Sequence, residues 1–217
     1  RETGQFDNTA ILFFSDHGDF TGDYGLVEKT QNTFEDGLTR VPLIFKPPAD
    51  RVARGIRDPL VELVDLPATV YELAGIRPGY THFGKSLLAA AADPCARHRD
   101  AVFCEGGRMA GEEGNCAEKN STSYFSPTGL YYPRISAQQN IPEHGKAAMC
   151  RTERYKYVKR FYESDEFYDL KDDPGEMKNR ILDPALAGEI QTLRNRMLDW
   201  YMATGDVVPL KMDKRNF

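Results

Sequence analysis

Residues 9–48, TAILFFSDHGDFTGDYGLVEKTQNTFEDGLTRVPLIFKPP, decide the predicted fold of this chain. Two short apolar runs, Ala10–Phe14 and Val41–Phe45, flank a connection rich in Asp, His, Gly and Lys. Each run is unbroken and rich in Ile, Leu, Phe and Val, which is typical of a strand buried on both faces of a parallel sheet. We therefore expect an α/β fold in which both runs are buried strands.

Polar residues begin where the first predicted strand ends, at Asp16 and His17. Ligands of open α/β sheets bind at the carboxyl ends of strands, so we expect the chemistry here and in the loop to Lys29. A carboxylate beside an imidazole suits a divalent cation, and Gly18 allows the sharp bend that lets side chains converge. Taken alone, such a pair in a loop is more often a solvated turn than a metal site.

The composition limits the classes of partner. The 217 residues suffice for one good-sized core or two small ones, and no segment approaches the run of roughly 20 apolar residues that a membrane helix needs. Lys plus Arg is 28 against 33 for Asp plus Glu, giving a net charge of -5. This balance argues against nucleic acid and membranes as partners. Because the sequence opens without Met and without a signal-peptide pattern, we expect a piece of a longer protein.

The four cysteines, Cys95, Cys104, Cys116 and Cys150, lie far apart and form no CxxC pair. Their spacing favours reduced thiols in a non-secreted protein over zinc ligands or a disulfide framework. A Cys104–Cys116 disulfide stays open as an alternative. The compartment is likewise open between the cytoplasm, which is slightly favoured, and a periplasmic or secreted location.

Several motifs occur in a fixed order along the chain. S-D-H-G-D at 15–19 is followed by G-D-Y-G-L at 22–26, Lys29, F-E at 34–35 and R-V-P-L-I at 40–44. Further on stand D-L-P-A-T at 65–69, L-A-G-I at 73–76, G-K-S-L-L at 84–88, the R-T to Y-K-Y stretch at 151–157 and Y-D-L at 168–170. Together these motifs resemble the sulfatase family of the alkaline phosphatase superfamily. The resemblance covers nearly the whole chain and leaves a gap only around residues 106–145.

The resemblance implies a C-terminal part of an alkaline-phosphatase-like α/β domain. In that arrangement residues 1–100 belong to the parallel sheet with its flanking helices. Residues 101–217 form a C-terminal subdomain with a long loop at 105–146, a small antiparallel sheet and a terminal helix.

Hydrophobic periodicity predicts the individual elements of this arrangement. A helix over 61–74 ends at Gly75, and a second helix spans 184–202. Strands are expected at 101–104, 147–152, 155–161 and 166–170. The basic run 151–160 alternates with Tyr and Val, which favours a half-buried strand over a nucleic-acid surface.

The resemblance also implies roles for single residues. Asp16 and His17 complete a divalent metal site, with Ca²⁺ as the first choice and Mg²⁺, Mn²⁺ or Zn²⁺ as alternatives. Lys29 binds the sulfate group, and Tyr24 stands where many relatives carry His. We expect Arg40, which precedes a predicted strand, to brace the loop through a salt bridge to Glu35 or Asp36.

The nucleophile of such an enzyme is missing from this sequence. Sulfatases use a formylglycine made within a C/S-x-P-x-R motif, and no Cys or Ser here is followed by x-Pro-x-Arg. The run C-E-G-G-R at 104–108 has the right span but lacks the Pro. We therefore expect the nucleophile upstream in the parent protein. Because two ligands hold a hard cation weakly, this chain alone should bind metal weakly and hydrolyse nothing.

Three functions follow as hypotheses. The first is a sulfatase acting on sulfate esters of small molecules or saccharides, in which this chain packs against the rest of its own catalytic domain. The second is a phosphonate monoester hydrolase or phosphodiesterase of the same superfamily. The third is a non-catalytic domain that serves assembly only. Homo-oligomerisation is compatible with each of them.

Overall fold

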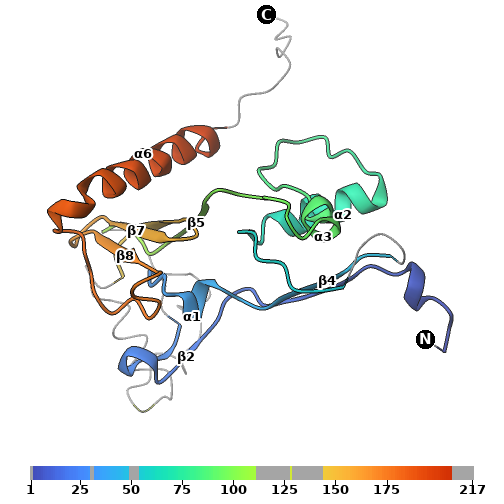
Figure 1. Cartoon of the computed structure of the whole chain (residues 1–217), viewed down its shortest axis with the longest axis horizontal. Coiled ribbons are helices and arrows are strands. Elements are labelled where there is room, and N and C mark those ends of the chain that lie inside the picture. Colours follow the sequence, from blue (N-terminus) through green and yellow to red (C-terminus); the bar gives the residue numbers. More distant parts are fainter. Residues whose placement is uncertain (1, 30–31, 49–53, 111–127, 129–143, 207–217) are drawn as a thin grey trace, which may run out of the picture.

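The computed structural model describes residues 2–29, 32–48, 54–110, 128 and 144–206. Most of the expected long loop 105–146 therefore lies outside the described residues. Two bodies of structure stand out: a sheet covered by a long helix, and a narrow two-stranded ribbon that extends from it toward the N-terminus (Figure 1). No described helix combines the length and the apolar character needed to cross a membrane.

In chain order, the helices and strands are the 3-10 helix η1 (Phe6–Asn8), β1 (Ile11–Phe14), β2 (Phe20–Thr21), the 3-10 helix η2 (Asp23–Gly25), β3 (Val27–Glu28), α1 (Asp36–Thr39), β4 (Leu43–Lys46), α2 (Asp65–Ala74), α3 (Leu88–Ala92), β5 (Val102–Gly106), β6 (Ala147–Arg151), β7 (Tyr155–Arg160), β8 (Glu166–Asp169), the 3-10 helix η3 (Pro184–Leu186) and α6 (Ala187–Thr204).

The two apolar runs form β1 and β4, but they pair with each other in antiparallel register from Ile11↔Lys46 to Phe14↔Leu43. They form a two-stranded ribbon, and the register partners Phe13 and Ile44 are each 62% exposed. The expectation of a parallel sheet with both strands buried is therefore wrong for the part of the chain that the structure describes, where every sheet is antiparallel. An unbroken apolar run predicts a strand whose side chains are buried, but it specifies neither the strand that pairs with it nor the direction of that strand.

The four-stranded sheet has the strand order β5-β6-β7-β8 and is antiparallel throughout, as predicted for the strands of the C-terminal part. Helix α6 lies across one face of it (Figure 1). The apolar stripe Ile190, Leu193 and Met197 of α6 packs there against Cys150 and Phe167 of the strands. This burial explains why the helix forms where the period of 3.6 residues predicted it.

The other face of the same sheet is also covered, by the segment 32–39 that contains α1. Phe34 packs there against Met149 and Val158. As a result, Lys156 of β7 is 0% exposed. The basic strand is thus buried on both faces rather than on one, because the Asp36 carboxylate and the Asn32 carbonyl oxygen of the 32–39 segment accept hydrogen bonds from its cations.

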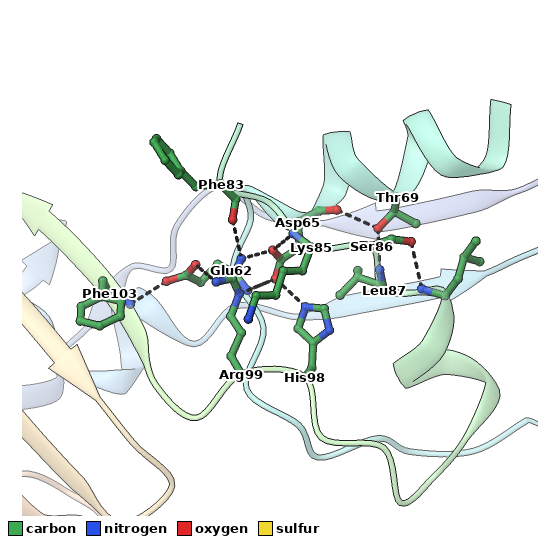
Figure 2. A network of polar contacts seen from close by, with 11 residues as sticks. Glu62, Asp65, Thr69, Phe83, Lys85, Ser86, Leu87, His98, Arg99 and Phe103 are labelled. Carbon is green, nitrogen blue, oxygen red and sulfur yellow. Dashed lines mark hydrogen bonds and ion pairs between the residues drawn. The ribbon is translucent and has the colours of Figure 1, made fainter. Parts of the chain in front are cut away.

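Helix α2 begins at Asp65, four residues later than predicted, and ends at Gly75 (φ 66°) as predicted. Asp65 is fully buried and accepts hydrogen bonds from the Lys85 backbone N–H (2.8 Å) and from the Arg99 side chain, and its Oδ2 lies 2.9 Å from His98 Nε2 (Figure 2). Burial raises the pKa of Asp65, but the hydrogen bonds from Arg99 and the backbone outweigh it and hold that pKa below its usual value.

Thr69, one turn after Asp65, accepts the backbone N–H of Leu87 at 2.9 Å (Figure 2). A Cβ on Gly84 would lie 2.1 Å from the carbonyl oxygen of Val64, so only glycine permits this approach. The motifs D-L-P-A-T and G-K-S-L-L are therefore two halves of one packing unit.

Candidate functional site

Asp16 and His17 lie just after β1, with Ser15 between the strand and Asp16. The Ser15 hydroxyl donates to the His17 carbonyl oxygen at 2.7 Å, and the His17 backbone N–H donates to Asp16 Oδ1 at 3.0 Å. The hydrogen bond from the His17 backbone lowers the pKa of Asp16. Asp16 is therefore an exposed carboxylate that is ionised at neutral pH.

The ring of His17 is oriented by its neighbour. Its Nδ1 lies 2.8 Å from the carbonyl oxygen of Gly18, which only accepts hydrogen bonds, so we assign the proton to Nδ1. The lone pair of the neutral ring is then on Nε2, which lies 3.7 Å from Asp16 Oδ2. Metal-binding histidines commonly donate their second ring nitrogen to a carbonyl in this way.

This donor set fits a divalent cation in kind, but it is only part of a ligand shell. An imidazole nitrogen and a carboxylate oxygen lie within a distance that a single cation can span, because such bonds are about 2.0–2.6 Å long. Among the described residues, no three His, Cys, Asp or Glu side chains gather around one point. The remaining ligands of a tightly held cation would have to come from elsewhere.

Lys29 follows β3 and lines the same open cavity as Asp16 and His17. That cavity has a volume of ≈ 2190 Å³ and extends along β4, the segment 54–64, α3 and β5. Small-molecule sites usually measure about 300–1,000 Å³, so the cavity is larger than one small ligand would fill. The three predicted site residues thus border the same cavity, and this cavity is large enough to accommodate additional polypeptide as well as a small ligand.

Tyr24 does not line this cavity. Its hydroxyl donates to the carbonyl oxygen of Gly175 at 2.9 Å, and its backbone has a φ of 56°. Burial, followed by the charges of Glu176 and Glu35, raises its pKa. In the described structure, Tyr24 connects the loop to the C-terminal part of the chain.

The expected salt bridge of Arg40 to Glu35 or Asp36 is wrong. Asp36 instead pairs with Arg151 (3.0 Å) and with Lys156 (2.9 Å). Both cations lie on the C-terminal sheet, more than a hundred residues away in sequence. Local spacing suggested Arg40 because it is near in sequence, and only the alternation of basic residues in 151–160 hinted at the true partners.

The cysteines described by the structure, Cys95, Cys104 and Cys150, carry free thiols, and Cys116 lies outside the described residues. Burial raises the pKa of Cys104 and raises that of Cys150 to about 12. A raised pKa disfavours the reactive thiolate. Cys104 is therefore poorly suited to act as a nucleophile, as the missing Pro in its motif indicated.

Comparison with known proteins places this geometry in a family. The family model described as Sulfatase matches residues 1–76. The chain is similar to the multifunctional alkaline phosphatase superfamily protein PehA of Trinickia caryophylli, with 29% identity over 94% of this chain and 36% of that protein. It is similar to a Δ4,5-hexuronate-2-O-sulfatase of Bacteroides thetaiotaomicron, with 29% identity over 95% of this chain and 37% of the relative.

The fold matches as well. The crystal structure of the phosphonate monoester hydrolase of Agrobacterium radiobacter superposes with a TM-score of 0.68 at 23% identity, covering 93% of this chain and 36% of that one. The N-terminal third of the chain thus matches the sulfatase family, and nearly its whole length is similar to a sulfatase and to an alkaline phosphatase superfamily protein. The chain spans about a third of the length of these relatives.

Proposed function

We propose that this chain supplies one wall of the active site of a sulfatase that hydrolyses sulfate esters. The observation that carries the proposal is that Asp16, His17 and Lys29 border one cavity, with the free nitrogen of His17 turned toward the Asp16 carboxylate. In this reading Asp16 and His17 hold a divalent cation, with Ca²⁺ as the first choice. Lys29 binds the sulfate group.

The chemistry of a sulfate ester fits these groups. Negative charge on the sulfate oxygens is stabilised by cations that are held in place beforehand, and a bound divalent metal would supply that charge as a Lewis acid. The Lys29 ammonium acts as a compact point charge on the same group. The attacking formylglycine would come from outside this chain, because no residue in its sequence lies in the required motif. The hexuronate sulfatase among its relatives supports a sulfated saccharide as substrate.

A phosphonate monoester hydrolase is the second candidate. The fold shared with the enzyme from Agrobacterium radiobacter favours it, since a phosphonate also presents anionic oxygens to a metal and a lysine. The parent protein that contains this chain should be assayed with an aryl sulfate and with an aryl phosphonate monoester. Faster hydrolysis of the sulfate supports our proposal, and faster hydrolysis of the phosphonate replaces it with the second candidate. Hydrolysis of neither ester would favour the non-catalytic assembly domain.

The metal pair can be tested on the chain itself with Mn²⁺ as a paramagnetic probe. We expect Mn²⁺ to broaden the NMR signals of the His17 ring selectively and to bind weakly, and Asp16→Asn to reduce the effect. The matched control is Asp19→Asn, because Asp19 is an exposed carboxylate three residues further along. Broadening that persists in Asp16→Asn, or that Asp19→Asn removes, would contradict the assignment.

The role of Lys29 can be tested by replacing it with Met in the parent protein. Loss of one charge-stabilising donor typically lowers catalysis by about 10²–10³-fold, and we expect kcat/KM for the sulfate ester to fall by that factor. The control is Lys178→Met, since Lys178 is exposed and does not line the cavity. A Lys29→Met enzyme as active as the control would exclude Lys29 from sulfate binding.

A further inference from the structure

A buried junction joins the segment 32–39 to the C-terminal sheet. Lys156 of β7 is 0% exposed, and its Nζ has three oxygen partners: Phe34 O (2.8 Å), Asp36 Oδ1 (2.9 Å) and Glu176 Oε2 (2.7 Å). An ammonium group has three N–H donors, so each of them is satisfied. Lysines are almost never fully buried unless they are paired, and two of the three partners of this one, Phe34 and Asp36, lie across the junction.

The same junction holds a second cation. Arg151 is the register partner of Lys156 on the neighbouring strand β6. Its guanidinium donates to both oxygens of Asp36, at 3.1 and 3.0 Å. Two cations facing each other on adjacent strands repel, and the Asp36 carboxylate between them relieves that repulsion. The sheet therefore binds α1 through the first residue of that helix.

Backbone strain is concentrated at this junction. Among the described residues, Tyr24 (φ 56°) and Glu176 (φ 54°) are the non-glycine residues with a positive φ. Tyr24 donates to the Gly175 carbonyl oxygen, and Glu176 Oε1 accepts the Asp36 backbone N–H at 2.8 Å. Strained residues persist only where the surrounding contacts fix them, and they gather at functional sites. Two such residues on either side of one contact indicate a junction with a defined geometry.

The junction leads directly to the Asp16–His17 pair. The Gly18 backbone N–H donates to the carbonyl oxygen of Leu38 in α1 at 2.8 Å. A Cβ on Gly18 would lie 1.9 Å from the carbonyl oxygen of Gly37, so helix and loop are in close contact. Gly18 in turn supplies the carbonyl that orients the His17 ring. From Lys156 to His17 the path runs through α1 and one backbone hydrogen bond.

We propose that Lys156 is a positioning residue for the Asp16–His17 pair, so that the C-terminal sheet sets the geometry of the candidate metal site. The ammonium group fixes Asp36 and Phe34, α1 fixes Gly18, and Gly18 fixes the ring of His17. This inference rests on the proposed function for the metal, but the orientation of His17 can be tested without it.

The test uses the whole 217-residue chain, ¹⁵N-labelled, with Lys156→Met as the variant. The matched control is Lys159→Met on the same strand, since Lys159 pairs with Asp165 and its side chain is 56% exposed. We expect Lys156→Met to speed hydrogen exchange of the Gly18 amide and to abolish the fixed-tautomer pattern of the His17 ring ¹⁵N signals. Its Mn²⁺ affinity should fall about tenfold, as for other residues that orient metal ligands. Lys159→Met should leave all three unchanged.

The measurements are made only on variants whose NMR signals from the α6 core show that the chain is folded. If Lys156→Met does not fold, the double variant Lys156→Met/Glu176→Gln is used in its place, because it removes one charge of each sign from the junction. Unchanged Gly18 exchange and His17 signals in a folded variant would overturn the inference. Failure of the wild-type chain to bind Mn²⁺ at His17 would contradict the proposed metal pair, while Gly18 exchange and the His17 signals would still decide the positioning role.

Discussion

At the scale of single residues, buried carboxylates connect distant parts of this chain. Asp65 contacts Lys85, His98 and Arg99, and it is completely removed from solvent. Burying a carboxylate costs free energy unless its cationic partners are present. Removing the carboxylate is also destabilising, because its buried partners then lose their counter-charge. The contrast with Asp183 is useful, because the pair of Asp183 with Arg180 is partly exposed and screened by water.

We predict that Asp65→Asn destabilises the chain by about 3 kcal/mol, since it breaks a buried ion pair and leaves Arg99 with Glu62, 3.1 Å away, as its remaining carboxylate partner. Asp183→Asn should have a much smaller effect, because it removes a surface ion pair screened by water and Asn can still cap η3. Urea unfolding of both variants measures the difference in the free energy of unfolding. Equal losses would mean that the Asp65 cluster does not carry the stability assigned to it.

At the scale of elements, helices α2 and α6 each have a glycine near one end, and the two glycines differ in conformation. Gly75 ends α2 with a φ of 66°, in the left-handed region that costs other residues energy. Gly188 lies in the first turn of α6, and a Cβ there would meet no atom within 4 Å. The same substitution should therefore have opposite effects at the two positions.

Gly75→Ala should destabilise the chain by about 1–2 kcal/mol, the cost of a left-handed alanine. Gly188→Ala should stabilise it by about 0.5–1 kcal/mol, because alanine loses less conformational freedom in a helix. Thermal unfolding followed by circular dichroism gives the two shifts in Tm. A rise in Tm for Gly75→Ala would show that α2 does not end in this conformation in solution.

At the scale of the whole molecule, the sheet β5–β8 lies between α6 on one face and the segment 32–39 on the other. Ion pairs hold both layers to it. Asp36 binds the inner segment to the sheet, and Asp165 binds Arg194 of α6 at 3.0 Å. Burial raises the pKa of each carboxyl group, but its cationic and hydrogen-bonding partners outweigh burial, so both pKa values lie below the usual value.

This arrangement predicts acid sensitivity of the packed layers. A carboxyl group with a lowered folded-state pKa contributes stability that is present above its unfolded pKa, about 3.9, and is lost as the pH falls through the folded-state value. The free energy of unfolding should therefore drop as the pH falls below about 4. Chemical denaturation at pH 7, 5 and 3 measures it. Burial raises the pKa of Glu176, and the protonation of that residue opposes the loss. A free energy of unfolding that stays constant down to pH 3 would contradict the predicted acid sensitivity and show that Glu176 fully offsets the loss.

The sequence by itself determined the similarity to sulfatases, the strands of the C-terminal sheet, the α6 helix and the end of α2. These features depend on local information: motif order, alternation, a period of 3.6 residues and a glycine at a helix end. It also singled out Asp16, His17 and Lys29, which line a common cavity in the structure, and the site assigned to them stays a prediction.

Only the tertiary structure decided which groups pair. It paired β1 with β4 in antiparallel register, brought Lys156 and Arg151 to Asp36, and gathered His98 and Arg99 around Asp65. Hydrophobic periodicity predicts that a side chain is buried, but it does not identify the atoms that pack against that side chain. The charged side chains in these pairs lie between 33 and 120 residues apart in sequence, and only the folded path of the chain brings them within hydrogen-bond distance.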